Sequence, residues 1–292
     1  MILVFGSINI DLLVPVPKLP RPGETVLGGD YRLSPGGKGA NQALAACRAG
    51  AAAVMAGAVG DDSFAGAALE LLKQEGVDLG LVRRVERPTG CAAIMVGGAG
   101  ENLIAVAPGA NAEAVASAVP DEVLGPGTIV LCQMEVPAAE TSALIYRAAA
   151  RGARTVLNLA PALAIGPGSL GDLDLLVANE MEAITLGGDP GHIAQRLRQG
   201  FVVTRGAAGS TAFLAGGERI DIPALAVDAV DTTGAGDTFV GVLAAGLDQG
   251  MTLEVALRRA SAAAGLACLA HGAQTAMPDR AAIEEAVARL AD

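Results

Sequence analysis

Aromatic side chains are scarce in this chain: they make up 2% of its 292 residues, and tryptophan is absent. Proteins that bind nucleic acids commonly stack bases on aromatic rings and hold phosphates with a basic surface. Here the net charge is −11, because 31 acidic residues outnumber 20 basic ones. These two shortages argue against a nucleic-acid partner and favour a small ligand.

Histidine and cysteine are also rare, which limits the chemistry that the chain can perform. The two histidines are too few for most His-based metal sites. The cysteines form no Cys-x-x-Cys pair; they are Cys47, Cys91, Cys132 and Cys268. This spacing excludes a zinc ribbon and is typical of reduced thiols in a cytosol.

Long apolar runs are missing as well, although the mean hydropathy is positive. No run of about 20 apolar residues lacks a polar interruption. Even the segment 40–59 contains Asn41, Gln42 and Arg48. The N-terminus has no basic region before its first apolar residues and therefore no recognisable signal peptide. We expect a soluble cytoplasmic protein without a membrane partner.

Short β-rich runs alternate along the chain with longer Ala/Leu-rich segments of helical period. The predicted strands are 2–6, 53–58, 128–132, 155–159, 173–178 and 201–204. The predicted helices are 40–49, 64–74, 138–151, 192–198, 238–247, 253–269 and 280–290. This alternation predicts an α/β fold, a doubly wound and mostly parallel sheet flanked by helices.

Two segments interrupt that alternation, at about 12–33 and 91–107. The first is rich in proline and glycine, and the second has Gly-Gly-Ala-Gly between two apolar runs. Both are typical of extended hairpins. We expect them to form a small β-sheet lid over a single domain that spans residues 1–292, because no long linker or repeat divides the chain.

The most informative stretch is residues 231–237, Asp-Thr-Thr-Gly-Ala-Gly-Asp, which runs into an apolar helical segment. Gly234 and Gly236 permit a tight turn that exposes backbone N–H groups, and the helix adds its positive dipole end. This predicts an anion site. Asp237 lies in the first helical turn, where a carboxylate can take a proton from a hydroxyl that attacks a phosphate. An Asp that only stabilises its own helix is the competing interpretation.

Polar residues gather at the predicted carboxyl ends of several strands, where open α/β sheets bind their ligands. They are Asn9, Asp11, Gln133, Glu135, Asn158, Asn179, Glu182 and Thr204. Any one of them is more often a helix cap or turn residue than a ligand. Their coincidence at several strand ends favours a binding edge.

Residues 35–42, Pro-Gly-Gly-Lys-Gly-Ala-Asn-Gln, form a second glycine-rich entry to a helix. It is not a Walker A loop, because Gly39 follows Lys38 where Ser or Thr is required. Adjacent glycines let the backbone approach a ligand, and Lys38 and Asn41 donate hydrogen bonds suited to hydroxyls or phosphate oxygens. A glycine turn with a solvated lysine explains this piece alone equally well.

These motifs occur in an order and spacing that resemble the PfkB family of sugar kinases. The strongest are residues 36–42, Asn179-x-x-Glu182 and residues 231–237. Residues 6–11, 22–25, 100–102, 108–111, 158–161 and 272–274 are similar to the family in place, so the likeness spans essentially the whole chain. It is closest to the members that act on ribose. The resemblance implies ATP-dependent phosphorylation of D-ribose at its 5-hydroxyl.

The resemblance also implies a role for each matching residue. Asp237 would be the catalytic base, and the N–H groups of Gly234, Ala235 and Gly236 would hold the transferring phosphoryl group. The sugar would be bound by Asn9, Asp11, Gly37, Lys38, Asn41 and Glu135. The ATP side would be lined by Asn179, Glu182, Thr204, Gly206 and Gly209, with Glu182 near Mg²⁺ and its waters. A monovalent cation, K⁺ by likeness, would lie at Asp231, Thr233 and Gly272, and the lid would pair two copies into a homodimer.

The chain departs from the family pattern at two places. Ser261 stands where relatives often carry His or Asn against the adenine, and Ala276 replaces a Ser near the cation loop, so base contacts and cation dependence stay open. The acceptor also stays open, because pockets for another small sugar or a nucleoside can differ by one hydroxyl. A sugar-binding homologue that has lost catalysis is a further alternative.

Overall fold

The computed structural model describes residues 1–163 and 169–290, and its centre is a nine-stranded sheet in the order β13-β12-β11-β10-β9-β8-β1-β4-β5. The strands are β1 (Ile2–Phe5), β4 (Ala53–Gly60), β5 (Asp78–Val85), β8 (Ile129–Cys132), β9 (Arg154–Asn158), β10 (Leu175–Asn179), β11 (Gly200–Thr204), β12 (Ser210–Leu214) and β13 (Arg219–Ile222). Pairing is parallel from β5 to β11, and β12 and β13 continue the sheet antiparallel. The predicted doubly wound, mostly parallel sheet is confirmed.

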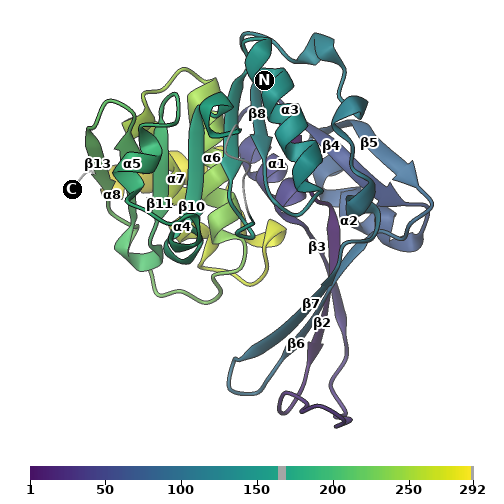
Figure 1. Ribbon diagram of the computed structural model, residues 1–292. Coiled ribbons are helices and arrows are strands. Elements are labelled where there is room, and N and C mark those ends of the chain that lie inside the picture. The colour runs from purple at the N-terminus through teal and green to yellow at the C-terminus, as the bar shows by residue number, and fades with distance from the viewer. Residues whose placement is uncertain (164–168, 291–292) are drawn as a thin grey trace.

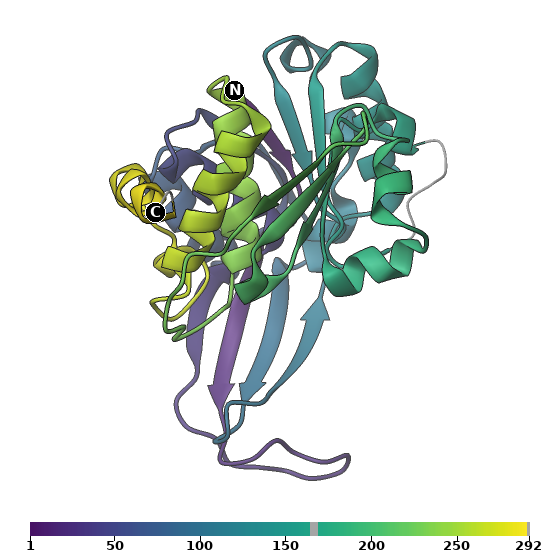
Figure 2. The same ribbon diagram turned by 90° about the vertical axis from the view of Figure 1, so that its left-hand side faces the viewer.

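Helices cover both faces of this sheet (Figures 1 and 2). They are α1 (Lys38–Arg48), α2 (Ser63–Gln74), α3 (Ala138–Ala150), α4 (Glu180–Leu186), α5 (Pro190–Ala194), α6 (Ala235–Asp248), α7 (Leu253–Ala267) and α8 (Arg280–Leu290). Alternate residues of one strand enter different cores: Ile2 and Val4 pack with α1, α6 and α7, whereas Leu3 and Phe5 pack with α3. Strands buried on both faces therefore read as continuous apolar runs. In the described ranges, no helix is both long and apolar enough to cross a membrane.

A separate four-stranded sheet extends away from the main body (Figure 1). Its order is β3-β2-β6-β7, formed by β2 (Asn9–Pro15), β3 (Arg32–Gly36), β6 (Gly90–Val96) and β7 (Asn102–Ala107). The central pair β2 and β6 is parallel, and the outer pairs are antiparallel. The small sheet expected from the two interrupting segments is thus present. It starts earlier than expected, so that Asn9 and Asp11 belong to one of its strands.

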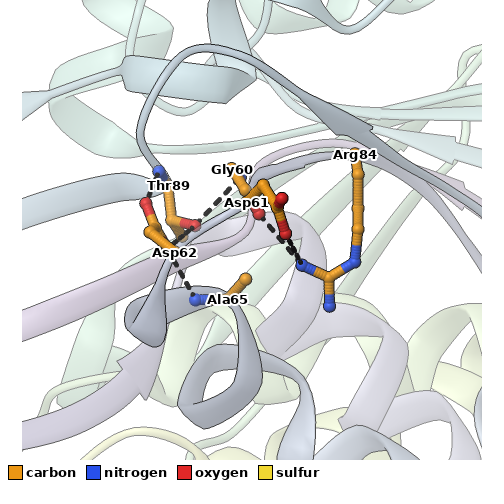
Figure 3. Close-up of polar contacts among 6 residues, drawn as sticks. All are labelled: Gly60, Asp61, Asp62, Ala65, Arg84 and Thr89. Atoms are coloured by element: carbon orange, nitrogen blue, oxygen red, sulfur yellow. Dashed lines mark hydrogen bonds and ion pairs between the residues drawn. The ribbon is translucent and has the colours of Figure 1, made fainter.

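The small sheet is anchored to the main body at the start of β6, as Figure 3 shows. Asp62 caps α2 by accepting a hydrogen bond from Ala65 N (2.9 Å), and it also accepts from Thr89 N (2.7 Å) and Thr89 Oγ1 (2.8 Å). Gly60 N at the end of β4 donates to Thr89 Oγ1 (3.0 Å), and Arg84 Nη1 of β5 donates to Gly60 O (3.2 Å). One carboxylate therefore ties the residue before β6 to the first turn of α2.

The sequence pattern misplaced one helix and missed several other elements. The helix predicted at 192–198 begins earlier, at Pro190, because Asp189 accepts hydrogen bonds from Gly191 N and His192 N, and it ends at Ala194. The strands β5, β12 and β13 and the seven-residue helix α4 were not predicted. Each of these strands has partly exposed positions, so none shows the continuous apolar run of a central strand.

Candidate active site

The glycine turn of residues 231–237 leads directly into α6. Gly234 is the residue before the first turn and has a φ of 75°, a left-handed conformation that favours glycine. A Cβ there would lie 2.8 Å from the Cα and Cβ of Ala273, so the space also requires glycine. The N–H groups of the first turn of α6 have no partner within the helix, and a helix end of this kind can bind an anion.

Asp237 lies in that first turn and is buried, with 8% of its surface exposed. Asn41 Nδ2 donates to its Oδ2 (2.9 Å), and Gln42 Nε2 donates to its Oδ1 (2.9 Å). Both amides come from α1. The carboxylate is therefore held in one orientation by two donors. Gln42 was not among the predicted site residues, and its only signal was its place beside Asn41.

A cavity of about 150 Å³ opens beside Asp237. It is lined by Lys38, Asn158, Ala160, Val177, Asn179, Glu182, Thr204, Gly234, Gly236, Asp237 and Val240. The fold thus brings together most of the residues expected to handle phosphate and nucleotide. Two larger hollows, of about 360 and 320 Å³, are lined by none of the predicted site residues. The cavity beside Asp237 is therefore distinguished from the two larger hollows by its polar and charged side chains and not by its volume.

On the nucleotide side, Asn179 and Glu182 bond to each other across the start of α4. Asn179 Oδ1 accepts from Glu182 N, and Glu182 Oε2 accepts from Asn179 N, each at 2.8 Å. Burial raises the pKa of Glu182. Gly206 and Gly209 do not line the cavity; both have positive φ, and a Cβ at Gly209 would lie 2.1 Å from Ile222 O.

On the sugar side, Asn9 is almost fully buried at the start of β2. Its Oδ1 accepts from Asn111 Nδ2 (2.7 Å), and Asn111 also bonds the backbone of Ile8 through both ends of its amide. Asn111 therefore fixes the start of the small sheet. The motif at residues 108–111 contained it, but no role was predicted for it.

Glu135 approaches the same region from the loop after β8. Its Oε2 accepts from Ser7 Oγ (2.5 Å) and from the backbone N of Lys38 (3.2 Å). The preceding Gly37 has a φ of 90°, and a Cβ there would lie 2.7 Å from Asn9 N. The glycine-rich entry to α1 is therefore packed directly against β2.

Acidic groups dominate the electrostatics of this site. Burial and the charges of Glu135 and Asp237 together raise the pKa of Asp11 to about 6, against the opposing charge of Lys38. Burial lowers the pKa of Lys38, but the charges of Asp237, Glu135, Glu182 and Asp11 outweigh this, so that its net pKa is raised. Lys38 is consequently a firmly protonated cation among carboxylates.

The residues expected to hold a monovalent cation also come together. Asp231 Oδ1 accepts from Thr233 N (2.9 Å) and Thr233 Oγ1 (2.6 Å), and Asp231 Oδ2 accepts from Gly272 N (2.9 Å). They lie outside the cavity, but the segment that follows Gly272 packs on Gly234 through Ala273. Ser261 is buried and donates to Pro223 O (2.6 Å), so its hydroxyl is occupied within the protein.

The chain is similar to known carbohydrate kinases over nearly all of its length. Residues 1–280 match the family described as pfkB family carbohydrate kinase. The ribokinase of Bacillus subtilis is 37% identical over 289 residues, which covers 97% of this chain and 98% of the relative. The structure of a ribokinase from Thermotoga maritima aligns with a TM-score of 0.91 at 30% identity and covers 99% of both chains. An Arabidopsis thaliana ribokinase complexed with ribose and ATP aligns with a TM-score of 0.89 at 31% identity and covers 98% of both chains.

Proposed function

This chain belongs to the pfkB family of carbohydrate kinases, and we propose that it phosphorylates D-ribose at the 5-hydroxyl with ATP, giving D-ribose 5-phosphate and ADP. The observation that carries the proposal is the buried Asp237 at the glycine turn, beside a cavity that it shares with Lys38 and Glu182. The names of the relatives, among them a ribokinase complexed with ribose and ATP, supply the acceptor and the donor.

In the proposed reaction, the ribose 5-oxygen forms a bond to the γ-phosphorus while the bond from that phosphorus to the β,γ-bridging oxygen breaks. Asp237 accepts the proton of the hydroxyl, and ADP leaves. The N–H groups of Gly234, Ala235 and Gly236 stabilise the charge on the transferring group. Lys38 adds a positive charge at the same cavity. Phosphoryl transfer mainly needs such positioning and charge stabilisation, so the scarcity of His and Cys is no obstacle.

The sugar would lie against the small sheet. We assign its hydroxyls to Asn9, Asp11, Gly37, Lys38, Asn41 and Glu135, and the nucleotide to Asn179, Glu182, Thr204, Gly206 and Gly209. Carboxylates and amides accept and donate hydrogen bonds to hydroxyls, which suits the first set to a polyol. A Cβ at Gly206 would meet nothing within 4 Å, so its backbone is open to a ligand.

Two cations belong to this proposal. Glu182 fits Mg²⁺, because its carboxylate lines the cavity and only one of its oxygens bonds to Asn179. The carboxylate would hold the ion through the water molecules that the ion carries. The bound ion would neutralise negative charge on the phosphates. K⁺ or another monovalent cation is assigned to the loop of Asp231, Thr233 and Gly272, where it would steady the glycine turn. Hydrogen bonds from Gly272 and Thr233 outweigh burial and lower the pKa of Asp231, so the group is anionic.

We also propose a cytoplasmic homodimer that pairs through the small sheet. Every residue of β7 is exposed, and Leu103, Ile104 and Val106 are 46%, 52% and 54% exposed. An apolar edge strand is a ready surface for another copy. Light scattering should give twice the chain mass, and Ile104→Lys should lower it. A monomeric mass for the unchanged chain would refute the dimer.

The function is tested by ADP formation from ATP and Mg²⁺ with D-ribose, 2-deoxyribose, fructose and nucleosides, each with and without K⁺. We expect turnover selective for D-ribose and stimulated by K⁺. Turnover with another acceptor would keep the kinase and change its substrate. Sugar binding without turnover on any acceptor would favour a non-catalytic binding protein.

A further inference from the structure

Two chains of buried side-chain amides converge on Asp237. In the first, Gln133 Nε2 donates to Gln42 Oε1 (2.7 Å), and Gln42 Nε2 donates to Asp237 Oδ1 (2.9 Å). In the second, Gln274 Nε2 donates to Asn41 Oδ1 (3.1 Å), and Asn41 Nδ2 donates to Asp237 Oδ2 (2.9 Å). Each chain ends on a different oxygen of the same carboxylate.

The carboxylate sets the direction of both chains. An ionised carboxylate only accepts hydrogen bonds, so the NH₂ ends of Asn41 and Gln42 must face Asp237. Their oxygens are then left to accept from the next amide. The last oxygens, Oε1 of Gln133 and Oε1 of Gln274, are buried without a hydrogen-bond partner among the described residues. Both glutamine side chains are fully buried.

Each terminal glutamine donates one buried hydrogen bond and keeps one unpartnered oxygen, so its net contribution to stability is small. A buried amide oxygen without a partner destabilises the folded state. Methionine has a similar length, and at either position it would move the unpartnered oxygen to Gln42 or Asn41. The glutamines are better explained by the neighbours to which they donate than by their own fit in the core.

We propose that Gln133, Gln42 and Gln274 are positioning residues that fix the orientation of the Asp237 carboxylate for proton transfer. This inference rests on the proposed function of Asp237 as the base. The protonated Lys38 attracts that carboxylate electrostatically, because both groups line the same cavity. A base that turned toward the lysine would lose its alignment with the attacking hydroxyl, and small misplacements are costly in catalysis.

The second chain also links the base to the loop beside the glycine turn. Gln274 follows Ala273, which contacts Gly234, and Arg48 Nη1 of α1 donates to Gln274 O (2.9 Å) and to Met277 O (2.8 Å). The same loop segment thus supports both the anion site and the orientation of the base. Gln42 itself is fully buried, and its Nε2 also donates to Oδ1 of Asn158 (3.0 Å), which lines the same cavity, so it acts on substrate through these two residues.

The first test is Gln133→Met, which removes the first donor of one chain and also its unpartnered oxygen. We expect kcat to fall about tenfold, the loss of about one hydrogen bond, while KM for D-ribose and for ATP stays within about twofold. The urea midpoint should change little, because removal of the unpartnered Gln133 oxygen is offset by loss of the donor to Gln42 Oε1. Gln249→Met is the control for the chemical change, because Gln249 is exposed at the far end of α6 and its amide donates to Ala49 O. This control should leave kcat unchanged.

The second test is Gln42→Glu, which keeps the shape of the side chain and places a carboxylate against Asp237 Oδ1. Like charges at this distance disfavour the ionised base, so the acidic limb of the pH profile of kcat should move up by about one pH unit or more. The other charged groups that act at the site are Lys38 from α1, Asp11 from β2, Glu135 from the loop after β8 and Glu182 from α4, and the substitution leaves them in place. A shift of that limb identifies Asp237 as the titrating base in contact with residue 42, whereas the loss of kcat at constant KM in Gln133→Met tests the positioning role.

The role is overturned if Gln133→Met lowers the urea midpoint in step with activity, if it raises KM at constant kcat, or if kcat does not change. It is equally overturned if the acidic limb of Gln42→Glu coincides with that of the unchanged chain. No turnover by the unchanged chain on any acceptor would instead refute the proposed function, and this role with it.

Discussion

The ionised carboxylate of Asp11 destabilises the folded state when no ligand is bound, and we predict that Asp11→Asn stabilises the protein above pH 6. Burial and the charges of Glu135 and Asp237 together raise the pKa of Asp11 to about 6 from 3.8. A raised folded-state pKa means that the folded protein binds this proton more tightly than the unfolded chain. The resulting stabilisation is complete below pH 3.8 and is lost as the pH rises through about 6.

The size of the effect follows from the two pKa values. A shift of about two units corresponds to about 3 kcal/mol at about 1.4 kcal/mol per unit. The side chain of Asp11 is only partly buried by surface area, so we expect about 1–2 kcal/mol in practice. For a chain of this size, that is a rise in Tm of roughly 3–6 °C at pH 8.

Urea denaturation at a series of pH values from 4 to 8 measures this difference directly. The gain in unfolding free energy of Asp11→Asn over the unchanged chain should grow between about pH 4 and 6 and then level off. The same substitution should weaken D-ribose binding about 10- to 100-fold, because a charged hydrogen-bond acceptor is lost.

Asp30→Asn is the control, because Asp30 is exposed in the connection between β2 and β3. It makes the same chemical change at an exposed position and should leave the urea midpoint at pH 8 nearly unchanged. A stability difference for Asp11→Asn that is independent of pH, or a destabilised variant at pH 8, would refute the reasoning.

Three further substitutions test other parts of the structure. Asp237→Asn should lower kcat about 100- to 10,000-fold while calorimetry still detects ribose binding, and a kcat within tenfold of the original would contradict its role as base. Gly234→Ala forces a φ of 75° on a residue whose Cβ would lie 2.8 Å from Ala273, so the unfolding free energy should fall by about 1–3 kcal/mol. An unchanged urea midpoint would count against this account of the turn. Burial raises the pKa of Asp62, but hydrogen bonds from Thr89 and Ala65 outweigh it, so the net pKa lies below 3.8. The stabilisation that the ionised Asp62 gives the folded state is therefore lost only as the pH falls through that low value. Asp62→Ala should therefore cost about 1 kcal/mol at pH 7, with the loss shrinking in strong acid, and a loss that persists there would show that its charge plays no part.

Much of the fold could be predicted because its central strands are buried on both faces. Such strands are continuous apolar runs, as in β8 and β10, and they are recognisable without knowledge of their neighbours. The strands that escaped prediction, β5, β12 and β13, have mixed burial. The helix around His192 was misplaced because Asp189 and Pro190 start it earlier than its apolar residues suggest.

Some residues of the candidate site could likewise be predicted from the sequence, and others could not. The glycine turn and Asp237 follow from the sequence, since a turn and a helix start depend on adjacent residues. Ser7 and Asn111 carry no comparable signal, because each acts through a partner more than 100 positions away, Glu135 and Asn9 respectively. Their contribution is visible only where those partners meet.

By itself, the sequence determined the class of fold and the glycine turn at the start of α6, because these depend on composition and on neighbours along the chain. Only the tertiary structure decided what surrounds Asp237. The donors to Asp237 lie 196 and 195 positions away, and the bond from Gln274 to Asn41 spans 233 positions. A local pattern cannot specify such a contact, because it forms only when α1, α6 and the loop after α7 pack together.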